Sequence, residues 1–324
     1  MAEPLVVLLY SSRFVSDEAL ALLGELVPLG FRWLPVEQGA GREARVAAFA
    51  AADYMFGYLG DPTTDELDTA RHLRLFQLLS AGYDWLDVEA FRSRGIPLAN
   101  NEGSNAVSTA EHAVLLMLAL LKQLPQHHAA TVRGEWLAMA HAMQMYELRG
   151  KVVGLVGFGN IARQVASRVH AFDAVVRYSK PKRASSELEQ PSGAQHRSLD
   201  ELLSESDIIS LHVPLTPATR GMIDARAIAR MRRGSWLINT ARGALVDETA
   251  LVEALVDGHL SGAGLDVFAH EPLDPGSPLL RLPNVVLTPH VAGSTRDTWR
   301  HRMATAWANV RRIEAGEEPA SRIV

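Results

Sequence analysis

The sequence predicts an α/β protein with two domains, each built around a parallel β-sheet. At 324 residues the chain is longer than one hydrophobic core usually supports. Short apolar runs alternate with helical patterns over the first hundred residues, and a second alternating series begins at Lys151. A glycine-rich turn opens that second series near the middle of the chain. Both series predict doubly wound sheets with helices on their faces.

In the first series, apolar runs predict strands and the amphipathic stretches after them predict helices. The expected strands are residues 5–9, 54–59 and 75–79, and the expected helices are residues 17–26, 64–72 and 88–94. Gly and Asn then interrupt the pattern, so we expect a change of domain near residue 100. A long apolar helix follows, for which Ser108 or Thr109 is the expected N-cap, and it is expected to end before Pro125.

The second series begins with a strand, the glycine turn and a helix that carries Ile161, Val165 and Val169 on one face. A strand at residues 174–178 completes one βαβ unit. The further expected strands are residues 207–212, 235–239, 262–267 and 285–287, and an amphipathic helix is expected over residues 298–314.

Composition and charge exclude several classes of function. Lys and Arg are scattered among the acids and the formal net charge is −5, so the sequence lacks the basic stripe with which proteins bind nucleic acid. The absence of cysteine excludes disulfides and thiolate metal sites and fits a reducing compartment. The N-terminus lacks the positive charge of a signal peptide, and the longest apolar run, residues 113–121, is well below the roughly 18 residues of a membrane span. We therefore expect a cytoplasmic protein with no membrane or nucleic-acid partner.

The glycine turn predicts a dinucleotide site. Gly157, Gly159 and Ala162 form the pattern G-x-G-x-x-A, with Phe158, Asn160 and Ile161 in the same turn. The first glycine permits the tight turn, the second permits close approach of a pyrophosphate, and the third position needs a small residue for packing. Glycines at turns often serve conformation alone, but here a strand precedes the turn and a helix N-terminus follows it.

The next strand ends in "VVRYSKPKRASS", which favours NADP(H) while NAD(H) stays possible. An acid that would bind the ribose hydroxyls is missing between Ala174 and Arg183. In its place are a hydroxyl and three cations that suit a 2′-phosphate: Ser179, Lys180, Lys182 and Arg183. A solvated basic loop is the alternative interpretation.

Five further segments carry a resemblance to a known family. "LLSAGYDWLD", "LHVPLTPATRGMI", "LINTARGALVDE", "GLDVFAHEPL" and "LTPHVAGST" resemble the D-isomer-specific 2-hydroxyacid dehydrogenases, in the order found in that family. The resemblance spans roughly residues 75 to 310. It implies two Rossmann-like domains, with the cofactor domain inserted into a flavodoxin-like substrate domain. Residues 1–100 and 290–324 would form the substrate (catalytic) domain, and residues 101–289 the dinucleotide-binding domain.

The resemblance also implies a catalytic set of Arg242, Glu271 and His290. His290 would give a proton to the keto oxygen during reduction, and Glu271 would bond the imidazole and orient it. Arg242 would bind the substrate carboxylate and polarise the carbonyl with its planar fork of donors. Taken one at a time, each also fits a plain structural or solvated position.

Other positions match the family's cofactor and substrate residues. Asp266 would bind the nicotinamide carboxamide, or serve only as a structural residue at a strand end. The remaining expected cofactor-lining residues are Asn105, Thr109, His212, Pro214, Thr219, Thr240 and Ala241. The backbone at Ser80, Ala81 and Gly82 would form an anion nest for the substrate carboxylate, with Arg242, His290 and Tyr58 also at the substrate. Roles for Leu59, Tyr83, Trp136 and the methionine-rich stretch before residue 150 are left open, and the histidines and acids predict no metal site.

The expected function is NADPH-preferring reduction of a small 2-oxo acid to a D-2-hydroxy acid. Phosphite or another small anion is an alternative substrate on the same scaffold; for formate, Gln would be expected at position 271. A non-catalytic nucleotide-sensing module is the alternative from another class. The resemblance further implies a homodimer with Asn105 to Leu124 at its two-fold interface.

Overall fold

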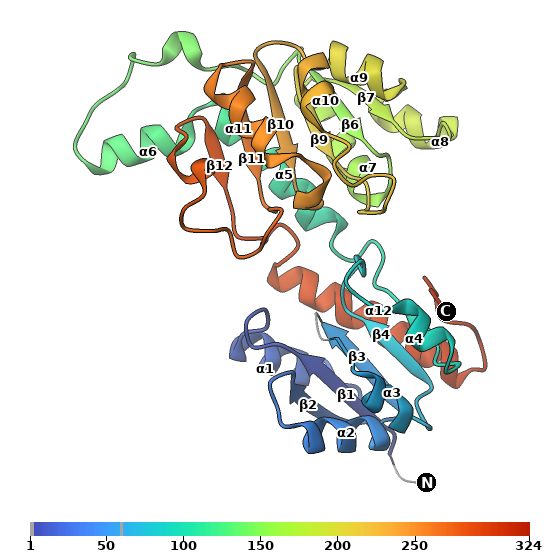
Figure 1. Ribbon diagram of the computed structural model, residues 1–324. Helices are drawn as coiled ribbons and strands as arrows, with labels where there is room; N and C mark the ends of the chain where they lie inside the picture. Colours follow the sequence, from blue (N-terminus) through green and yellow to red (C-terminus); the bar gives the residue numbers. More distant parts are fainter. Residues whose placement is uncertain (1–2, 59–60) are drawn as a thin grey trace. The chain divides into compact units, whose positions relative to one another are not determined.

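The computed structural model describes residues 3–58 and 61–324 and divides into two compact units. Unit 1 comprises Met1–Asn105 and Ser294–Val324, and unit 2 comprises Ala106–Gly293. The expected changes of domain, after residues 100 and 289, lie a few residues before these boundaries. Unit 2 is therefore inserted into the chain of unit 1 (Figure 1).

Unit 1 contains a five-stranded parallel sheet in the order β2-β1-β3-β4-β5. This is the flavodoxin-like order. Its elements are β1 (Leu5–Tyr10), α1 (Asp17–Glu25), β2 (Arg32–Glu37), α2 (Arg42–Ala51), β3 (Tyr54–Tyr58), α3 (Thr64–Thr69), β4 (Leu75–Leu78), α4 (Val88–Arg92), β5 (Leu98–Ala99) and α12 (Arg296–Glu314).

Alternate residues of β1 supply the two cores of unit 1. Val7 and Leu9 pack with α2, α3 and α4, whereas Val6 and Leu8 pack with α1 and α12. The last helix thus covers a face of the first sheet, which explains why the chain returns to unit 1.

Unit 2 contains a seven-stranded parallel sheet in the order β12-β11-β10-β9-β6-β7-β8. This is the Rossmann order with one additional strand. Its elements are α5 (Ala106–Leu121), α6 (Leu124–Val132), η1 (Ala142–Gln144), β6 (Val152–Val156), α7 (Asn160–Ala171), β7 (Val175–Ser179), α8 (Ser186–Glu189), η2 (Gln190–Ser192), β8 (Gln195–His196), α9 (Leu199–Glu205), β9 (Ile208–Leu211), α10 (Ala225–Arg230), β10 (Ser235–Asn239), η3 (Gly243–Leu245), α11 (Glu248–Val256), β11 (Leu260–Leu265), η4 (Pro278–Arg281) and β12 (Val285–Leu287).

Both faces of this sheet are covered by helices. Ile208 packs into the core formed with α5 and α7, and its neighbour Ile209 packs into the core formed with α9, α10 and α11. The expected second βαβ series is confirmed, with strand boundaries within two residues of the prediction. The order changes direction between β6 and β9, so the carboxyl ends of these strands form the switch point at which ligands bind such sheets.

The predicted N-cap of the long helix is wrong. Helix α5 begins at Ala106, so Ser108 and Thr109 lie inside it. The Ser108 hydroxyl donates to the Ala292 carbonyl at 2.7 Å, a tertiary bond that replaces the expected cap. The helix does end before Pro125, which lies in the first turn of α6, where a missing N–H costs little.

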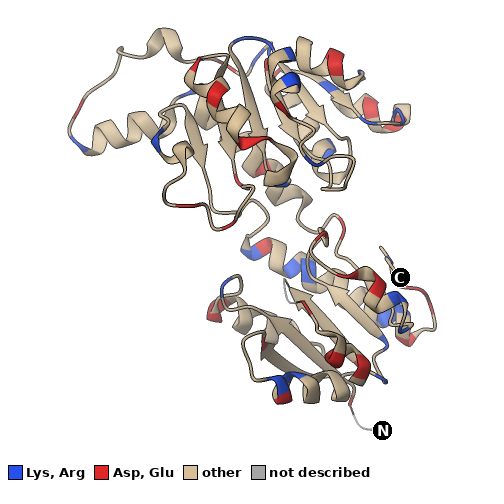
Figure 2. Cartoon of the chain, in the orientation of Figure 1, with Lys and Arg blue, Asp and Glu red and all other residues tan. Residues whose placement is uncertain are grey.

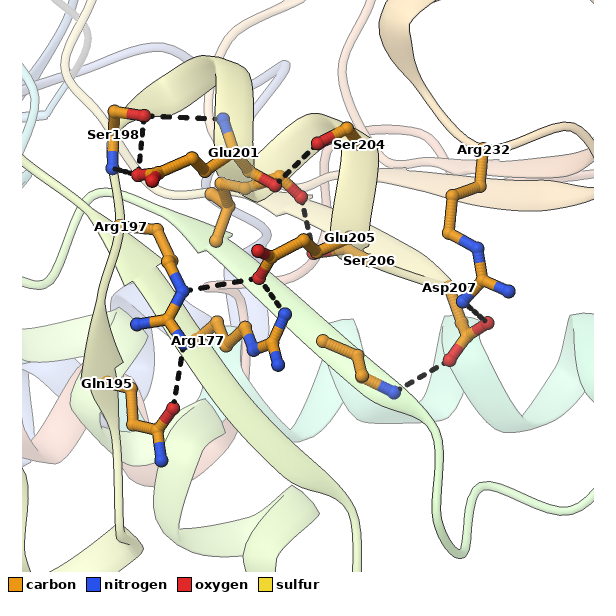
Figure 3. A network of polar contacts seen from close by, with 12 residues as sticks. Arg177, Gln195, Arg197, Ser198, Glu201, Ser204, Glu205, Ser206, Asp207 and Arg232 are labelled. Atoms are coloured by element: carbon orange, nitrogen blue, oxygen red, sulfur yellow. Dashed lines mark hydrogen bonds and ion pairs between the residues drawn. The ribbon is translucent and has the colours of Figure 1, made fainter.

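A polar network holds the edge of the second sheet (Figure 3). Arg177 of β7 and Arg197 after β8 both contact the Glu205 carboxylate at the end of α9. Arg197 also donates to Gln195 Oε1 at 3.0 Å. Helix α9 starts with a capping box between Ser198 and Glu201. The two-residue strand β8 is thereby tied to α9 and to β7.

Basic and acidic residues are interspersed on both units (Figure 2). Among the described residues, no single helix combines the length and apolarity needed to cross a membrane, and α5 and α6 meet both criteria only when taken together across a 66° bend.

Candidate active site

The glycine turn lies at the switch point of the second sheet, between β6 and α7. Gly157 has φ +99°, and a Cβ there would lie 2.6 Å from the His212 carbonyl oxygen after β9. Gly159, the N-cap of α7, has no atom within 4 Å of a Cβ position, so its backbone is open to close approach. Ala162 is fully buried in the helix–sheet contact. These features fit a dinucleotide pyrophosphate at the uncapped helix N-terminus.

The loop after β9 borders the same switch point. His212 Nε2 lies 2.9 Å from Ser210 Oγ, and burial lowers the pKa of His212 to about 3, so its imidazole is neutral. The Thr219 hydroxyl donates to the Pro214 carbonyl at 2.7 Å and so closes the loop on itself. The three expected cofactor residues of this segment therefore lie on one ordered loop.

A buried asparagine shapes the turn after β10. Asn239, 1% exposed, accepts the Ala241 N–H at 3.0 Å and donates to the Arg242 carbonyl at 2.9 Å. Thr240, in the same turn, has a buried hydroxyl with no hydrogen-bond partner among the described residues, and the same holds for Thr109 of α5. Buried hydroxyls of this kind fit positions that a bound polar ligand would contact. Sequence reasoning did not single out Asn239.

The basic loop after β7 is bound to a carboxylate that was not expected from the sequence, that of Glu189, the last residue of α8. Arg183 donates through Nε and Nη2 to the two oxygens of Glu189 at 2.9 and 2.8 Å. The Tyr178 hydroxyl also donates to Glu189, at 2.5 Å, and accepts the Ala184 N–H. The bonds from Arg183 and then Tyr178 lower the pKa of Glu189 to about 2 despite its desolvation. Ser179 is the last residue of β7, and Lys180 and Lys182 lie on the loop that these bonds order.

His290 and Glu271 form a hydrogen-bonded pair. His290 Nδ1 lies 2.7 Å from Glu271 Oε2, and Glu271 Oε1 accepts the Phe268 N–H at 3.1 Å. Burial alone would raise the pKa of Glu271, but the bond and charge of His290, the Phe268 N–H and the Arg242 charge hold it below its usual range. The carboxylate is thus kept ionised against the imidazole. Such a pair can move a proton to or from a bound carbonyl oxygen.

Arg242 belongs to the same electrostatic cluster, because its charge acts on Glu271. Its Nη1 donates to the Ala241 carbonyl at 2.8 Å. A Cβ at Gly243 would overlap the Phe268 carbonyl group, so only glycine lets this turn pack against the segment that leads to Glu271. The structure therefore brings together all three expected catalytic residues at the carboxyl ends of the unit 2 strands.

The Asp266 carboxylate, 1% exposed, lies at the end of β11 and accepts several bonds from residues 288–292. Its Oδ1 accepts the Thr288 hydroxyl and the Val291 N–H, and its Oδ2 accepts the Ala292 N–H at 2.9 Å. The expected cofactor residue thus contacts the loop that carries His290.

The expected substrate residues Ser80, Ala81, Gly82 and Tyr58 lie in unit 1. Ser80 Oγ donates to the Gly82 carbonyl at 2.8 Å, and Asn100 Nδ2 donates to the Ala81 carbonyl at 2.7 Å. The buried Tyr58 ring packs against Trp299 and lies 4.7 Å from the Arg302 guanidinium.

Of the residues whose roles were left open, Tyr83 is partly exposed in unit 1, and Trp136 is 84% exposed in unit 2. Leu59 lies outside the described residues.

Comparison with known proteins gives the family. Residues 114–292 match the model of the D-isomer specific 2-hydroxyacid dehydrogenase NAD-binding domain. A glyoxylate reductase of Korarchaeum cryptofilum is 39% identical over 271 residues, 82% of this chain and 81% of the relative. A D-3-phosphoglycerate dehydrogenase of Mycobacterium tuberculosis is 38% identical over 94% of this chain, but this match covers 56% of that protein's length.

The fold is shared with solved structures as well. The crystal structure of a glyoxylate reductase from Paecilomyes thermophila superposes with a TM-score of 0.80 at 30% identity, covering 99% of this chain and 98% of that one. Together with the matched NAD-binding domain, this similarity supports a nicotinamide cofactor. The chain belongs to the D-isomer-specific 2-hydroxyacid dehydrogenase family.

Proposed function

We propose that this enzyme reduces a small 2-oxo acid to the D-2-hydroxy acid, with NADPH as the preferred cofactor and NADH as the possible second. The observation that carries the proposal is the 2.7 Å contact between His290 Nδ1 and Glu271 Oε2, with Arg242 close enough to act on the same carboxylate. An acid/base pair beside a guanidinium is the chemistry that a 2-oxo acid requires. The relatives named glyoxylate reductase support the same substrate class.

In this proposal each side chain has a separate task. The nicotinamide, when bound, supplies hydride to the carbonyl carbon. His290 gives the proton to the carbonyl oxygen from Nε2, because Nδ1 is engaged by Glu271. Glu271 holds the ring in this orientation and stabilises the imidazolium form. Arg242 binds the carboxylate and polarises the carbonyl. In the reverse direction His290 accepts the proton.

The residues expected to hold the cofactor lie on several loops of unit 2 and on α5. We propose that the turn of Gly157, Phe158, Gly159, Asn160 and Ile161 receives the pyrophosphate on the N-terminus of α7. The other contacts are assigned to His212, Pro214 and Thr219 after β9, to Thr240 and Ala241 after β10, and to Thr109 of α5. The acceptor capacity left on Asp266 Oδ2, which takes one N–H, is assigned to the carboxamide.

The preference for NADPH rests on the loop after β7. Arg183 has a 68% exposed side chain although it is bound to Glu189 on one edge, and it lies on the same loop as Ser179, Lys180 and Lys182. The three cations outnumber the carboxylates of Glu187 and Glu189, so the segment from the loop to the end of α8 is net positive. A 2′-phosphate is attracted by that charge, whereas the 2′-hydroxyl of NADH gains little from it. The substrate carboxylate is assigned to the backbone of Ser80, Ala81 and Gly82, beside Tyr58 in unit 1.

The test is a cofactor-oxidation screen with the purified protein. NADPH and NADH are each offered with glyoxylate, hydroxypyruvate, pyruvate, phenylpyruvate and branched 2-oxo acids, and NADP⁺ reduction is followed with phosphite and formate. We expect turnover of at least one 2-oxo acid, with kcat/KM higher for NADPH, and a loss of about 10²-fold or more in kcat for His290→Ala. Normal turnover in that variant, or oxidation of phosphite alone, would contradict the proposal. A clear NADH preference would contradict its cofactor part.

We also propose that the enzyme is a homodimer. Helix α6 and the segment that follows it up to η1, residues 124–144, form an arm that extends away from the sheet of unit 2 (Figure 1). This arm and the adjoining face of α5 expose large apolar side chains, whose contact with water is unfavourable. They are Leu115, Leu124, Val132, Trp136, Met139 and Met143. A second copy of the chain is the proposed occupant of this surface. The cytoplasmic location expected from the sequence stays a prediction.

A further inference from the structure

The loop that carries His290 is held in an uncommon conformation. His290 has φ +55°, in the left-handed region that residues other than glycine rarely adopt. Its N–H donates to the Asp266 carbonyl at 2.8 Å, while the Asp266 carboxylate accepts the N–H groups of Val291 and Ala292. Such a conformation persists only where surrounding bonds impose it. The position of the imidazole therefore depends on what holds Asp266 and Thr288 in place.

The packing of α5 on β11 brings His112 to this point. Gly262 and Gly264 of β11 and Asp266 just after it are spaced two residues apart, so all three lie on the same face of the sheet. A Cβ at Gly264 would lie 2.9 Å from Leu116 Cβ, and one at Gly262 would lie 3.2 Å from Leu120 Cδ2, so α5 lies closely on this face. His112 is one helical turn before Leu116. The close contact at the glycines thus sets the histidine above Asp266.

The hydrogen bonds that result have a defined direction. The Thr288 hydroxyl has one proton, which it donates to Asp266 Oδ1 at 2.6 Å. His112 Nε2 lies 2.9 Å from the same hydroxyl oxygen, which can only accept there. His112 must therefore be protonated on Nε2. The same nitrogen lies 3.6 Å from Asp266 Oδ1, and the His112 side chain is 14% exposed.

We propose that His112 is a positioning residue for His290. Its Nε2–H fixes the Thr288 hydroxyl, which directs its proton to Asp266, and Asp266 in turn anchors the backbone of residues 290–292. A role of this kind keeps a catalytic group in its productive geometry without contact to the reacting atoms. The consequence for turnover rests on the proposed acid/base role of His290, whereas the consequence for the loop does not.

The test compares the full-length wild-type enzyme with His112→Phe, which keeps a planar ring and removes the donor, and His112→Gln, which keeps a donor at similar reach. For His112→Phe we expect kcat to fall at least tenfold with the KM for NADPH within twofold, and the amides of Val291 and Ala292 to exchange hydrogen at least tenfold faster. His112→Gln should restore most of both properties. His170→Phe, an exposed histidine change on α7, is the matched control and should alter neither.

Several results would overturn the proposal. The first is that the amides of Val291 and Ala292 exchange hydrogen in His112→Phe at the wild-type rate. The second is a kcat of His112→Phe within twofold of the wild-type value. The third is a set of ¹⁵N shifts showing that His112 of the wild-type protein carries its proton on Nδ1 and none on Nε2. If His112→Phe does not fold, Thr288→Val must give the faster amide exchange, and unchanged exchange there would also overturn it. If His290→Ala keeps normal turnover, the proposed function fails, while the amide exchange still decides the anchoring.

Discussion

The negative charge of Glu271 gives it a function that a glutamine of the same shape would lack. Because its pKa is held below the usual value of 4.5, Glu271 stays ionised throughout the neutral pH range and stabilises an imidazolium at His290. Glu271→Gln keeps an acceptor for Nδ1 but removes the charge. We expect kcat to fall at neutral pH by about tenfold or more, within the range attributed to general acid–base catalysis. Steady-state kinetics with the best substrate of the screen would measure this.

The control for this change is Glu248→Gln, because Glu248 also accepts a backbone N–H of the neighbouring segment, from Ala269, but makes no bond to the imidazole. Equal losses in the two variants would mean that the order of the segment, rather than the charge beside His290, matters for turnover.

The three residues proposed as catalytic could be singled out from the sequence, because each lies in a short segment that resembles the family. The hydrogen bonds that hold these residues in position could not be predicted. His112 and Thr288 are 176 residues apart, and Asp266 and Ala292 are 26 apart. Bonds over such separations depend on how α5 packs on β11, which no local pattern records. Glu189 was missed for a related reason. It lies six residues beyond Arg183, and only the fold of the chain through α8 brings its carboxylate back to that side chain.

At the scale of elements, Glu189 binds the loop between β7 and α8, and we expect the stability that it contributes to depend on pH. The pKa of Glu189 is lowered from its ordinary 4.5 to about 2, chiefly by Arg183 and Tyr178. A carboxylate with a depressed pKa in the folded protein contributes stability that is present above its unfolded pKa and lost as pH falls through the folded value. For Glu189→Gln we expect a lower melting temperature than wild type at pH 7 and a difference that shrinks between pH 4.5 and pH 2.

Thermal melts of both proteins across this pH range would measure the effect. Glu187→Gln changes a carboxylate of the same helix that bonds only the nearby Ser185 among the described contacts, and it should show a smaller effect at every pH. A Glu189→Gln difference that is constant with pH would show that the ionised carboxylate is not what orders the loop.

Most elements were predictable because their periodicity is strong. The fully buried strands β9 and β10 each contain mostly apolar residues, and both were expected. Strand β2 was not, because it lies at a sheet edge, contains Pro35 and is partly exposed along its length. The start of α5 was placed too late because Ser108 and Thr109 resemble caps. Their hydroxyls serve tertiary contacts or remain buried, which the residue type alone does not reveal.

At the scale of the molecule, alternating strands and helices predicted two parallel sheets, and the resemblance predicted that one domain is inserted in the other. The physical reason for the insertion lies in the last helix. Trp299 and Trp307 of α12 fill the core against Val6 and Leu8 of β1, about 300 residues away in the chain. Amphipathicity predicted the helix but did not identify the sheet that it covers, because both sheets offer apolar faces.

The arm of unit 2 leads to the last prediction, which concerns assembly. Trp136 is 84% exposed and Met143 is 91% exposed, and a group of large exposed apolar side chains on one segment is typical of a surface that binds a partner. If a second copy covers them, the wild-type protein has twice the mass of one chain in sedimentation equilibrium, and Trp136→Ser with Met143→Ser weakens the dimer at least tenfold. Val256→Ser changes an apolar, 69% exposed residue of α11, outside residues 124–144, and should leave the mass unchanged. A monomeric wild type would contradict the proposed dimer, and a dimer insensitive to the arm variants would place its interface elsewhere. Because none of the residues expected at the cofactor or the reacting atoms lies in the arm, a dissociated but folded variant would also reveal whether one chain alone suffices for turnover.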